Sequence, residues 1–229
     1  MQIKKANGQE IVTFCLLTLL SGFMIGIGGT ASLLANATMG LWSRLIGAVL
    51  FSLGIFAIVT YGMKLFTGMV ADIPQMGVKN LWRLAVCFCG NTLGVLLVAL
   101  LVKHSFLADV VVPKGAAIIA AKLSADRWAL GSFCSAVLCG WLITLSVLAP
   151  KYASKKNLSA SVGVIFPVVV FAFCGFDHSV ANMLYFYFAG EFSWRIVGYI
   201  ACSILGNVVG GLLLPLVMML KEKADQANE

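Results

Sequence analysis

The sequence predicts an all-α integral membrane protein with six transmembrane helices, which form two inverted three-helix repeats in which helices two and five are broken. Three observations lead to this prediction: the composition, the number of long apolar runs and an internal repeat. Of the 229 residues, 61% are apolar and only 11% are charged, and the mean hydropathy is +0.99. A soluble domain is about 45–50% apolar and about 25% charged. The composition therefore indicates a chain that folds in lipid, and it excludes nearly all soluble enzyme folds.

Six apolar runs are long enough to cross a bilayer, which takes about 20 residues per helix. They cover residues 11–34, 45–74, 81–102, 128–148, 158–188 and 196–220. Residues 103–127 carry scattered charges and are expected to form a long connection, in which 116–121 is a candidate re-entrant stretch. Pro150 is expected to end the fourth run.

Two of the runs are interrupted within their apolar region. The second run contains Lys64, followed by Gly68 and Pro74, and the fifth run is interrupted at Cys174-Gly175-Phe176-Asp177-His178. Irregular backbone at membrane depth survives only where it is buried in protein or lines a cavity. Both breaks are therefore expected to lie inside the protein.

An internal repeat divides the chain into halves. Gly90-Asn91-Thr92-Leu93-Gly94 in the third run matches Gly206-Asn207-Val208-Val209-Gly210 in the sixth, 116 residues later. Each half has an intact run, a broken run and a G-N-x-x-G run, and three spans per half place the halves in opposite orientations. The prediction is a single domain, 1–229, with repeats at about 8–102 and about 127–220. The alternative is chance similarity between glycine-rich packing segments.

The two asparagines of this repeat lie in the middle of apolar runs, where their amides need partners. One interpretation of Asn91 and Asn207 is hydrogen bonding between helices. The other is that they cap a loop that lines a pore.

The basic residues indicate orientation. The net charge is +7, from 16 Lys and Arg against 9 Asp and Glu, but the basic residues occur singly between apolar runs. This pattern is typical of a topology signal and of contacts with membrane lipid, and it does not favour nucleic-acid binding. Nine basic residues fall on the side of the termini and six on the other side. We therefore expect a multi-pass protein of the plasma (inner) membrane with both termini in the cytoplasm.

The seven cysteines all lie in apolar runs, and none has the spacing of metal ligands. They are interpreted as small buried core residues. Neither a disulfide nor a metal nor another cofactor is expected.

Few ionisable residues lie at membrane depth, and charges there are costly and typical of functional sites. The candidates are Lys64, Asp177 and His178; the alternative for His178 is a structural histidine bonded to nearby backbone. His104 lies at the end of the third run, so the two histidines do not form the facing pair that a haem needs. The sequence has no G-x-S-x-G, H-E-x-x-H or P-loop motif, so we expect no enzyme.

The segment Gly175-Phe176-Asp177-His178-Ser179-Val180-Ala181-Asn182-Met183 resembles the signature of the formate/nitrite transporter family, G-[FY]-E-H-S-[IV]-A-N-M. Leu65-Phe66-Thr67-Gly68 is similar to that family's motif at its broken second helix, and the G-N-x-x-G segments match its third and sixth helices. The resemblance covers residues 11–220. It implies an aquaporin-like fold, a homopentamer with one pore per protomer, and passage of small monovalent anions such as formate, nitrite or hydrosulfide.

The resemblance also implies roles for individual residues. His178 corresponds to a central pore histidine, and Thr67 to the threonine that reaches it. Two apolar slits flank this pair, and Lys122 corresponds to a basic residue outside the pore. The slit residues are Leu65, Phe66 and Ile55 on one side and Phe51 and Phe171 on the other.

Three positions depart from the family pattern. Lys64 stands where a carboxylate is common, Asp177 stands where the family has Glu, and Gly140 stands where relatives often have Asn. We interpret Gly140 as the loss of an amide on the pore side. We also consider that Lys64 and Asp177 form a compensating ion pair.

A physical mechanism fits these residues. An apolar slit rejects ions because dehydration is costly, whereas a weak acid that takes up a proton crosses as a neutral molecule. A histidine, with an ordinary pKa of about 6.5, suits that exchange of protons. Two alternatives stay open: an aquaporin-like channel for small neutral solutes, although N-P-A boxes are absent, and a proton-coupled secondary transporter.

Overall fold

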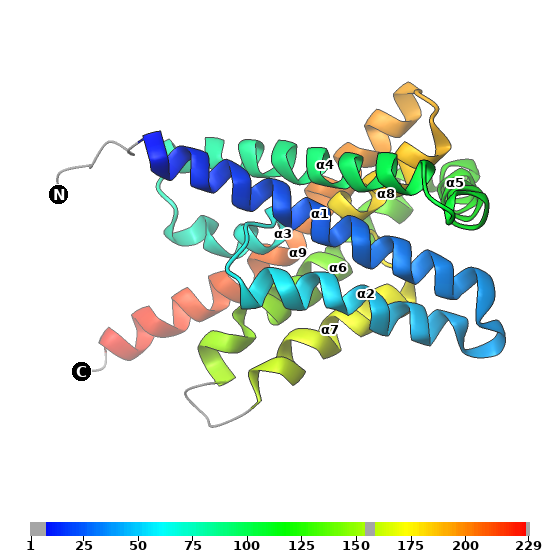
Figure 1. The fold of residues 1–229 in the computed structure, drawn as a ribbon. Coiled ribbons are helices and arrows are strands. Elements are labelled where there is room, and N and C mark those ends of the chain that lie inside the picture. Colours follow the sequence, from blue (N-terminus) through cyan, green and yellow to red (C-terminus); the bar gives the residue numbers. More distant parts are fainter. Residues whose placement is uncertain (1–7, 154–158, 228–229) are drawn as a thin grey trace.

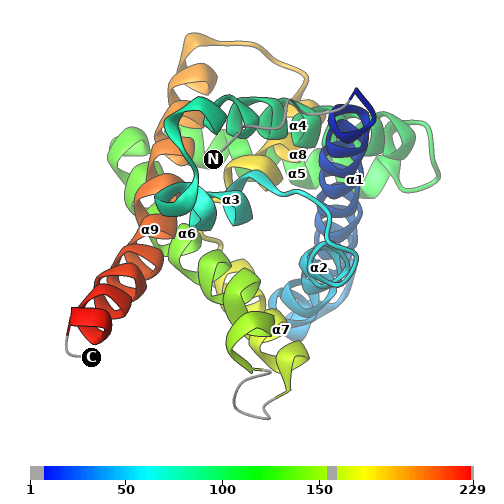
Figure 2. The same cartoon turned by 90° about the vertical axis from the view of Figure 1, so that its left-hand side faces the viewer.

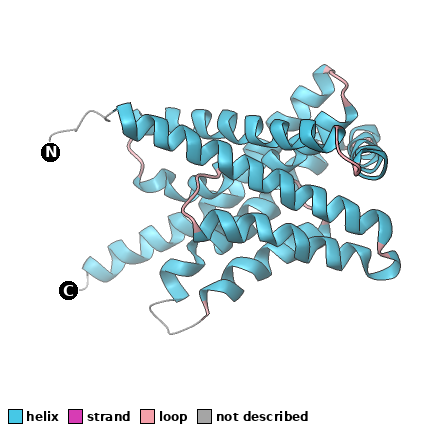
Figure 3. Ribbon diagram, in the orientation of Figure 1, coloured by secondary structure: helices cyan, strands magenta, loops and turns pink. Residues whose placement is uncertain are grey.

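The structure, a computed structural model, describes residues 8–153 and 159–227, and these residues form helices joined by short loops (Figures 1 and 3). Lys4, Lys5, Lys155 and Lys156, which entered the charge count, lie outside the described residues. The helices are α1 (Gly8–Thr38), η1 (Gly40–Trp42), α2 (Ser43–Thr60), α3 (Phe66–Met69), η2 (Val70–Gln75), η3 (Val78–Asn80), α4 (Trp82–Lys103), α5 (Ala108–Ser124), α6 (Trp128–Ala153), α7 (Ala160–Cys174), α8 (Ser179–Ala189) and α9 (Trp194–Ala227).

The long helices run side by side as a bundle, and Figure 2, which looks along it, shows the short α3 among them. Five helices in the described part are long and apolar enough to cross a membrane, or up to six if α7 and α8, which meet at 44°, count as one bent span. The exact number of six spans therefore stays a prediction. The start of α1 and the end of α9 lie at the same end of the bundle (Figure 1).

The two halves of the chain follow the same plan. In the first half α1 packs against α2 and α4, and in the second half α6 packs against α7 and α9. Glycines allow the helices to cross closely, because a Cβ added to Gly22 would overlap the Asn91 carbonyl, and a Cβ added to Gly140 would overlap the Asn207 carbonyl. The interpretation of Gly140 as a lost pore-side amide is therefore wrong. The position faces the backbone of α9 and has no room for a side chain.

Residues 103–127 differ from the prediction of a connection with a re-entrant stretch. They contain the 17-residue helix α5, whose buried residues Val111, Gly115 and Ile119 recur every four positions on one face. The helix lies across one end of the bundle and is viewed along its axis in Figure 1. The scattered charges hid this pattern, because Asp109, Lys114 and Lys122 interrupt the apolar residues along the segment.

Two further expectations are corrected. The helix α6 continues through Pro150 to Ala153, since packing against neighbouring helices outweighs the single hydrogen bond that proline removes. Only Cys87 and Cys139 among the seven cysteines are buried within the chain, and all seven are unpaired. An apolar run in a membrane protein does not reveal which of its faces is turned inward, because lipid accepts apolar side chains as readily as the core does.

Candidate functional site

The chain leaves the helical conformation in the same way at two places. After α2 it turns at Gly62, with φ 65°, and after α7 it turns at Gly175, with φ 72°, a region that glycine enters without steric cost. Met63 N–H donates to the Ile58 carbonyl (2.9 Å), and Phe176 N–H donates to the Phe171 carbonyl (3.0 Å). Both ends therefore show the closing bond of a Schellman cap.

The asparagines of the internal repeat hold these breaks. Oδ1 of Asn91 accepts from the Phe66 N–H (2.8 Å), while its Nδ2 donates to the carbonyls of Lys64 (2.9 Å) and Thr18 (2.7 Å). The amide thus binds the first break at two points and the neighbouring helix α1 at a third, so capping and helix–helix bonding occur together at Asn91.

Asn207 repeats this arrangement in the second half. Its Oδ1 accepts from the Ser179 N–H (2.8 Å), and its Nδ2 donates to the carbonyls of Asp177 and Ala136 (both 2.9 Å). In each half the amide bridges residue i and residue i+2 of the break. Lys64 and Phe66 in the first half thus correspond to Asp177 and Ser179 in the second.

Thr67 and His178 meet where the two breaks come together. His178 is buried, and its Nδ1 accepts from the Ala181 N–H (3.1 Å) at the start of α8. A neutral imidazole with this bond carries its hydrogen on Nε2, which then donates to Oγ1 of Thr67 (3.0 Å). The structure therefore joins two residues that are 111 positions apart in the chain.

Aromatic rings cover His178 on the α5 side. The Phe171 ring stacks on the imidazole, with centroids 5.8 Å apart, and the Phe51 ring meets Phe171 edge to face at 5.5 Å. Ile55 and Leu65 are buried, with Leu65 just before α3. The ring of Phe66, by contrast, packs edge to face on Phe88 of α4 at 5.3 Å.

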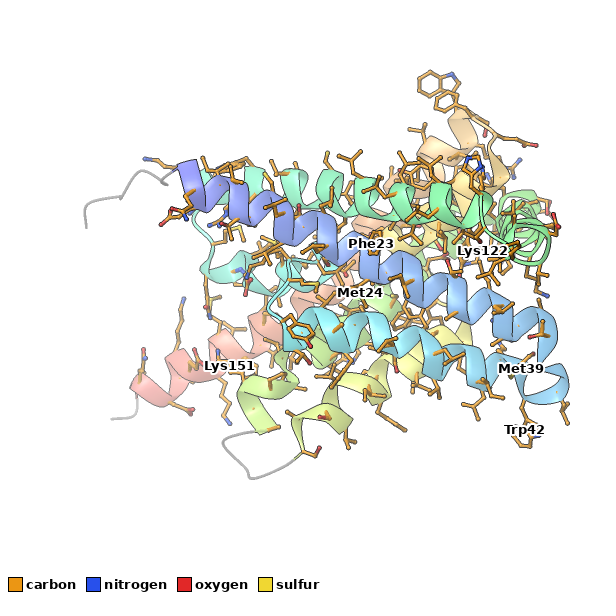
Figure 4. The ribbon with its side chains drawn as sticks, viewed as in Figure 1. Phe23, Met24, Met39, Trp42, Lys122 and Lys151 are labelled. Carbon is orange, nitrogen blue, oxygen red and sulfur yellow. The ribbon has the colours of Figure 1, made fainter. Side chains whose placement is uncertain are left out.

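A cavity of about 320 Å³ opens beside these rings. Phe51, Phe171 and His178 contribute to its wall, together with side chains from α1, α5 and α8. Its basic lining residues are Arg44, Lys114 and Lys122. Figure 4 shows Lys122 at the α5 end of the bundle, and Lys151 at the opposite end.

Asp177 binds three donors at this end of the site. Its Oδ1 accepts from Lys122 Nζ (2.6 Å), Tyr199 Oη (2.6 Å) and Asn182 Nδ2 (2.9 Å), and the carboxylate is almost fully buried. The hypothesis of a Lys64–Asp177 ion pair is therefore wrong, because Lys122 is the basic residue that pairs with Asp177. The side chain of Lys64 instead lines a groove between α1 and α4.

The sequence interpretation missed Arg44 and Tyr199. Arg44 was counted only as a topology signal, although its Nη2 donates to the Cys174 carbonyl (3.2 Å), 130 residues away. Tyr199 lies within an apolar run that gave no indication of a buried carboxylate partner. Asn182 was not singled out either, although it lies inside the signature segment, which was a usable signal. No group of three or more His, Cys, Asp or Glu side chains suited to a metal ion occurs in residues 8–153 and 159–227.

Comparisons with known proteins identify a family and several similar transporters. The sequence model of a family described as formate/nitrite transporter matches residues 2–221. The probable formate transporter of Methanothermobacter thermautotrophicus is 31% identical over 246 residues, which cover 92% of this chain and 87% of that protein. The uncharacterized transporter YrhG of Bacillus subtilis (strain 168) is 31% identical over 188 residues, covering 75% and 69%.

A solved structure shares the fold. A pentameric formate channel with formate bound superposes with a TM-score of 0.76 at 23% identity, over 96% of this chain and 100% of that one. The predicted class, an all-helical membrane protein with this channel fold, is confirmed.

Proposed function

The chain belongs to the formate/nitrite transporter family, and from this premise we propose that it is a membrane channel for small monovalent weak-acid anions, such as formate, nitrite or hydrosulfide. It works as a multi-pass homopentamer of the plasma membrane with one pore in each protomer, and it catalyses no chemical reaction. The pentameric state of its structural neighbour supports this assembly.

The buried pair of Thr67 and His178 carries the proposal. It lies where two helix breaks meet, beside a cavity with three basic residues, and His178 contributes to the cavity wall together with the rings of Phe51 and Phe171. The basic lining attracts an anion, and the contact of Phe51 with Phe171 strips most of its water because an apolar constriction disfavours hydrated ions. Ile55, Leu65 and Phe66 form the second slit in this proposal.

The hydrogen bonds of the pair define what an anion meets there. Since Nε2–H of His178 donates to Oγ1 of Thr67, the hydroxyl hydrogen of Thr67 is left to donate to the anion. A second proton fits on the imidazole only at Nδ1, and only if the bond from the Ala181 N–H opens. Transfer of a proton between His178 and the anion is therefore coupled to the opening of this hydrogen bond at the start of α8.

Flux into liposomes that contain the purified protein tests the proposal. Formate, nitrite, hydrosulfide and chloride are compared at pH 5 and pH 7.5. We expect selective flux of a weak-acid anion that is faster at pH 5. Passage of water or glycerol without anion flux would contradict the proposal and indicate a pore for neutral solutes. Uptake that requires a proton gradient would indicate a proton-coupled transporter.

His178→Asn tests the role of the imidazole. The variant keeps a hydrogen-bonding side chain but removes the titratable ring, so we expect a changed pH dependence or changed selectivity of flux. The matched control is His104→Asn, because His104 is an exposed histidine at the end of α4. An unaltered pH profile in His178→Asn would exclude proton exchange at this residue.

A further inference from the structure

The carbonyl end of α7 faces the basic cavity. Two of its last carbonyls are used within the cap, since Phe171 and Ala172 accept from Phe176 N–H and Gly175 N–H. The carbonyls of Cys174 and Gly175 follow in the chain and take no part in these cap bonds. They carry the negative end of the helix dipole, equivalent to about half an electron charge. An anion that approaches His178 from the cavity therefore meets a helix end of its own sign.

Two cations cover these carbonyls. Arg44 Nη2 donates to the Cys174 carbonyl (3.2 Å), and Lys122 Nζ donates to the Gly175 carbonyl (3.4 Å). Arg44 is further fixed by its guanidinium group, which lies 5.7 Å from the centroid of the Phe173 ring. The left-handed turn at Gly175 leaves room for it, because a Cβ there would lie 3.3 Å from Arg44 Nη2.

The charges of the two cations are not equivalent. Lys122 forms an ion pair with Asp177 at 2.6 Å, so much of its charge is compensated. Arg44 forms no ion pair with a carboxylate within residues 8–153 and 159–227, and it also lines the cavity. Its full charge thus remains available to the helix end and to an incoming anion.

This cation cap is absent from the corresponding break of the first half. The carbonyls of Tyr61 and Gly62, at the end of α2, accept no hydrogen bond from a basic side chain of the described residues, although the backbone turns are alike. The break itself therefore does not require a cation. Arg44 is a feature of the α7 end alone, where the cavity lies.

We propose that Arg44 promotes anion entry: it neutralises the carbonyl end of α7 and thereby admits anions from the cavity to the contact of Phe51 with Phe171. This inference rests on the proposed anion channel. Arg44→Gln is expected to slow anion entry without disturbing the aromatic contact or the pair of Thr67 and His178. Arg44→Lys, which keeps the charge, is expected to retain most of the flux.

Arg195→Gln supplies a matched control. Arg195 is also exposed at the α5 end, its Nη2 donates to a backbone carbonyl (Ala125, 3.4 Å), and its guanidinium lies 5.4 Å from the Trp128 ring centroid. It does not contribute to the wall of the cavity. The two arginines thus have similar bonds, and only one of them faces the proposed path.

The experiment measures formate flux in liposomes at 0.01 M and 0.15 M potassium gluconate, with thermal unfolding of each variant as the check on folding. We expect Arg44→Gln to lower flux about fivefold at 0.01 M and less than about twofold at 0.15 M, because the Debye length falls from about 30 Å to about 8 Å. Equal flux in Arg44→Gln and Arg195→Gln, or a loss that is independent of salt and shared by Arg44→Lys, would overturn the role of Arg44. Absence of anion flux through the unmodified protein would instead overturn the proposed function on which this role depends.

Discussion

At the scale of single residues, the hydrogen bonds already formed within the site determine which hydrogen atom is left for an anion. The Ala181 N–H fixes the tautomer of His178, and the imidazole in turn uses one lone pair of the Thr67 oxygen. Asp177 likewise already accepts hydrogen bonds from Lys122, Tyr199 and Asn182. The threonine hydroxyl hydrogen is thus the donor that this arrangement leaves for an anion in the proposed path.

Thr67→Val tests that hydroxyl. Valine has nearly the shape of threonine but leaves Nε2–H of His178 without its acceptor and removes the donor for the anion. We expect flux to fall about tenfold, which corresponds to the loss of roughly 1.4 kcal/mol of hydrogen bonding. Liposome flux provides the measurement. Thr92→Val is the control, because the Thr92 hydroxyl donates only to the Phe88 carbonyl of its own helix; similar flux in both variants would contradict the role of Thr67.

At the scale of helices, the sequence indicated some elements well and others poorly. The sequence interpretation placed the first break from Lys64, Gly68 and Pro74 and the second at Cys174 to His178. The chain turns at Gly62 and Gly175, which adopt positive φ, so the second break was located more closely than the first. The helix α5 was missed, since the charges scattered along it made the segment resemble a connection. The family motifs indicated His178 and Thr67, but Arg44 approaches Cys174 only through the packing of α2 against α7. No local pattern encodes that contact.

The crossing of α6 and α9 depends on Gly140. A methyl group at this position would overlap the Asn207 carbonyl, and a backbone atom cannot move aside by rotation of a side chain. We expect Gly140→Ala to destabilise the protein by about 1–3 kcal/mol, which is typical of overpacking. The midpoint of thermal unfolding in detergent measures the effect.

Gly131→Ala is the control within the same helix. A Cβ added to Gly131 meets nothing within 4 Å in the chain, and alanine favours a helix by about 1 kcal/mol over glycine. Its midpoint should therefore equal or exceed that of the unmodified protein. Equal midpoints for the two alanine variants would show that the crossing tolerates the methyl group, and that Gly140 has another role.

At the scale of the whole molecule, the two halves are alike in backbone but unlike in charge. Both breaks use a left-handed glycine and an asparagine from a neighbouring helix. Only the second has Lys122, Arg44 and the cavity of α5 beside it. The sequence repeat predicts the similarity of the halves. The difference comes from α5, which has no counterpart in the repeat, and from Arg44 at the start of α2.

The orientation in the membrane is the last testable property. The start of α1 and the end of α9 lie at one end of the bundle together with Lys151, whereas Lys122 lies at the other end (Figures 1 and 4). The sequence interpretation assigned nine basic residues to the side of the termini, four of which lie outside the described residues, and six to the other side. Because cytoplasmic loops carry the excess of Lys and Arg, the α5 end and its cavity are expected to face outward.

Fusions to two reporters measure this orientation in cells. A fluorescent protein that matures only in the cytoplasm should be bright after Glu229 and dark when it follows a chain ended at Ser105, just before α5. A phosphatase that is active only outside the cytoplasm should give the opposite pattern. Phosphatase activity of the fusion after Glu229 would show the opposite orientation. The cavity with Arg44 would then receive anions from the cytoplasm.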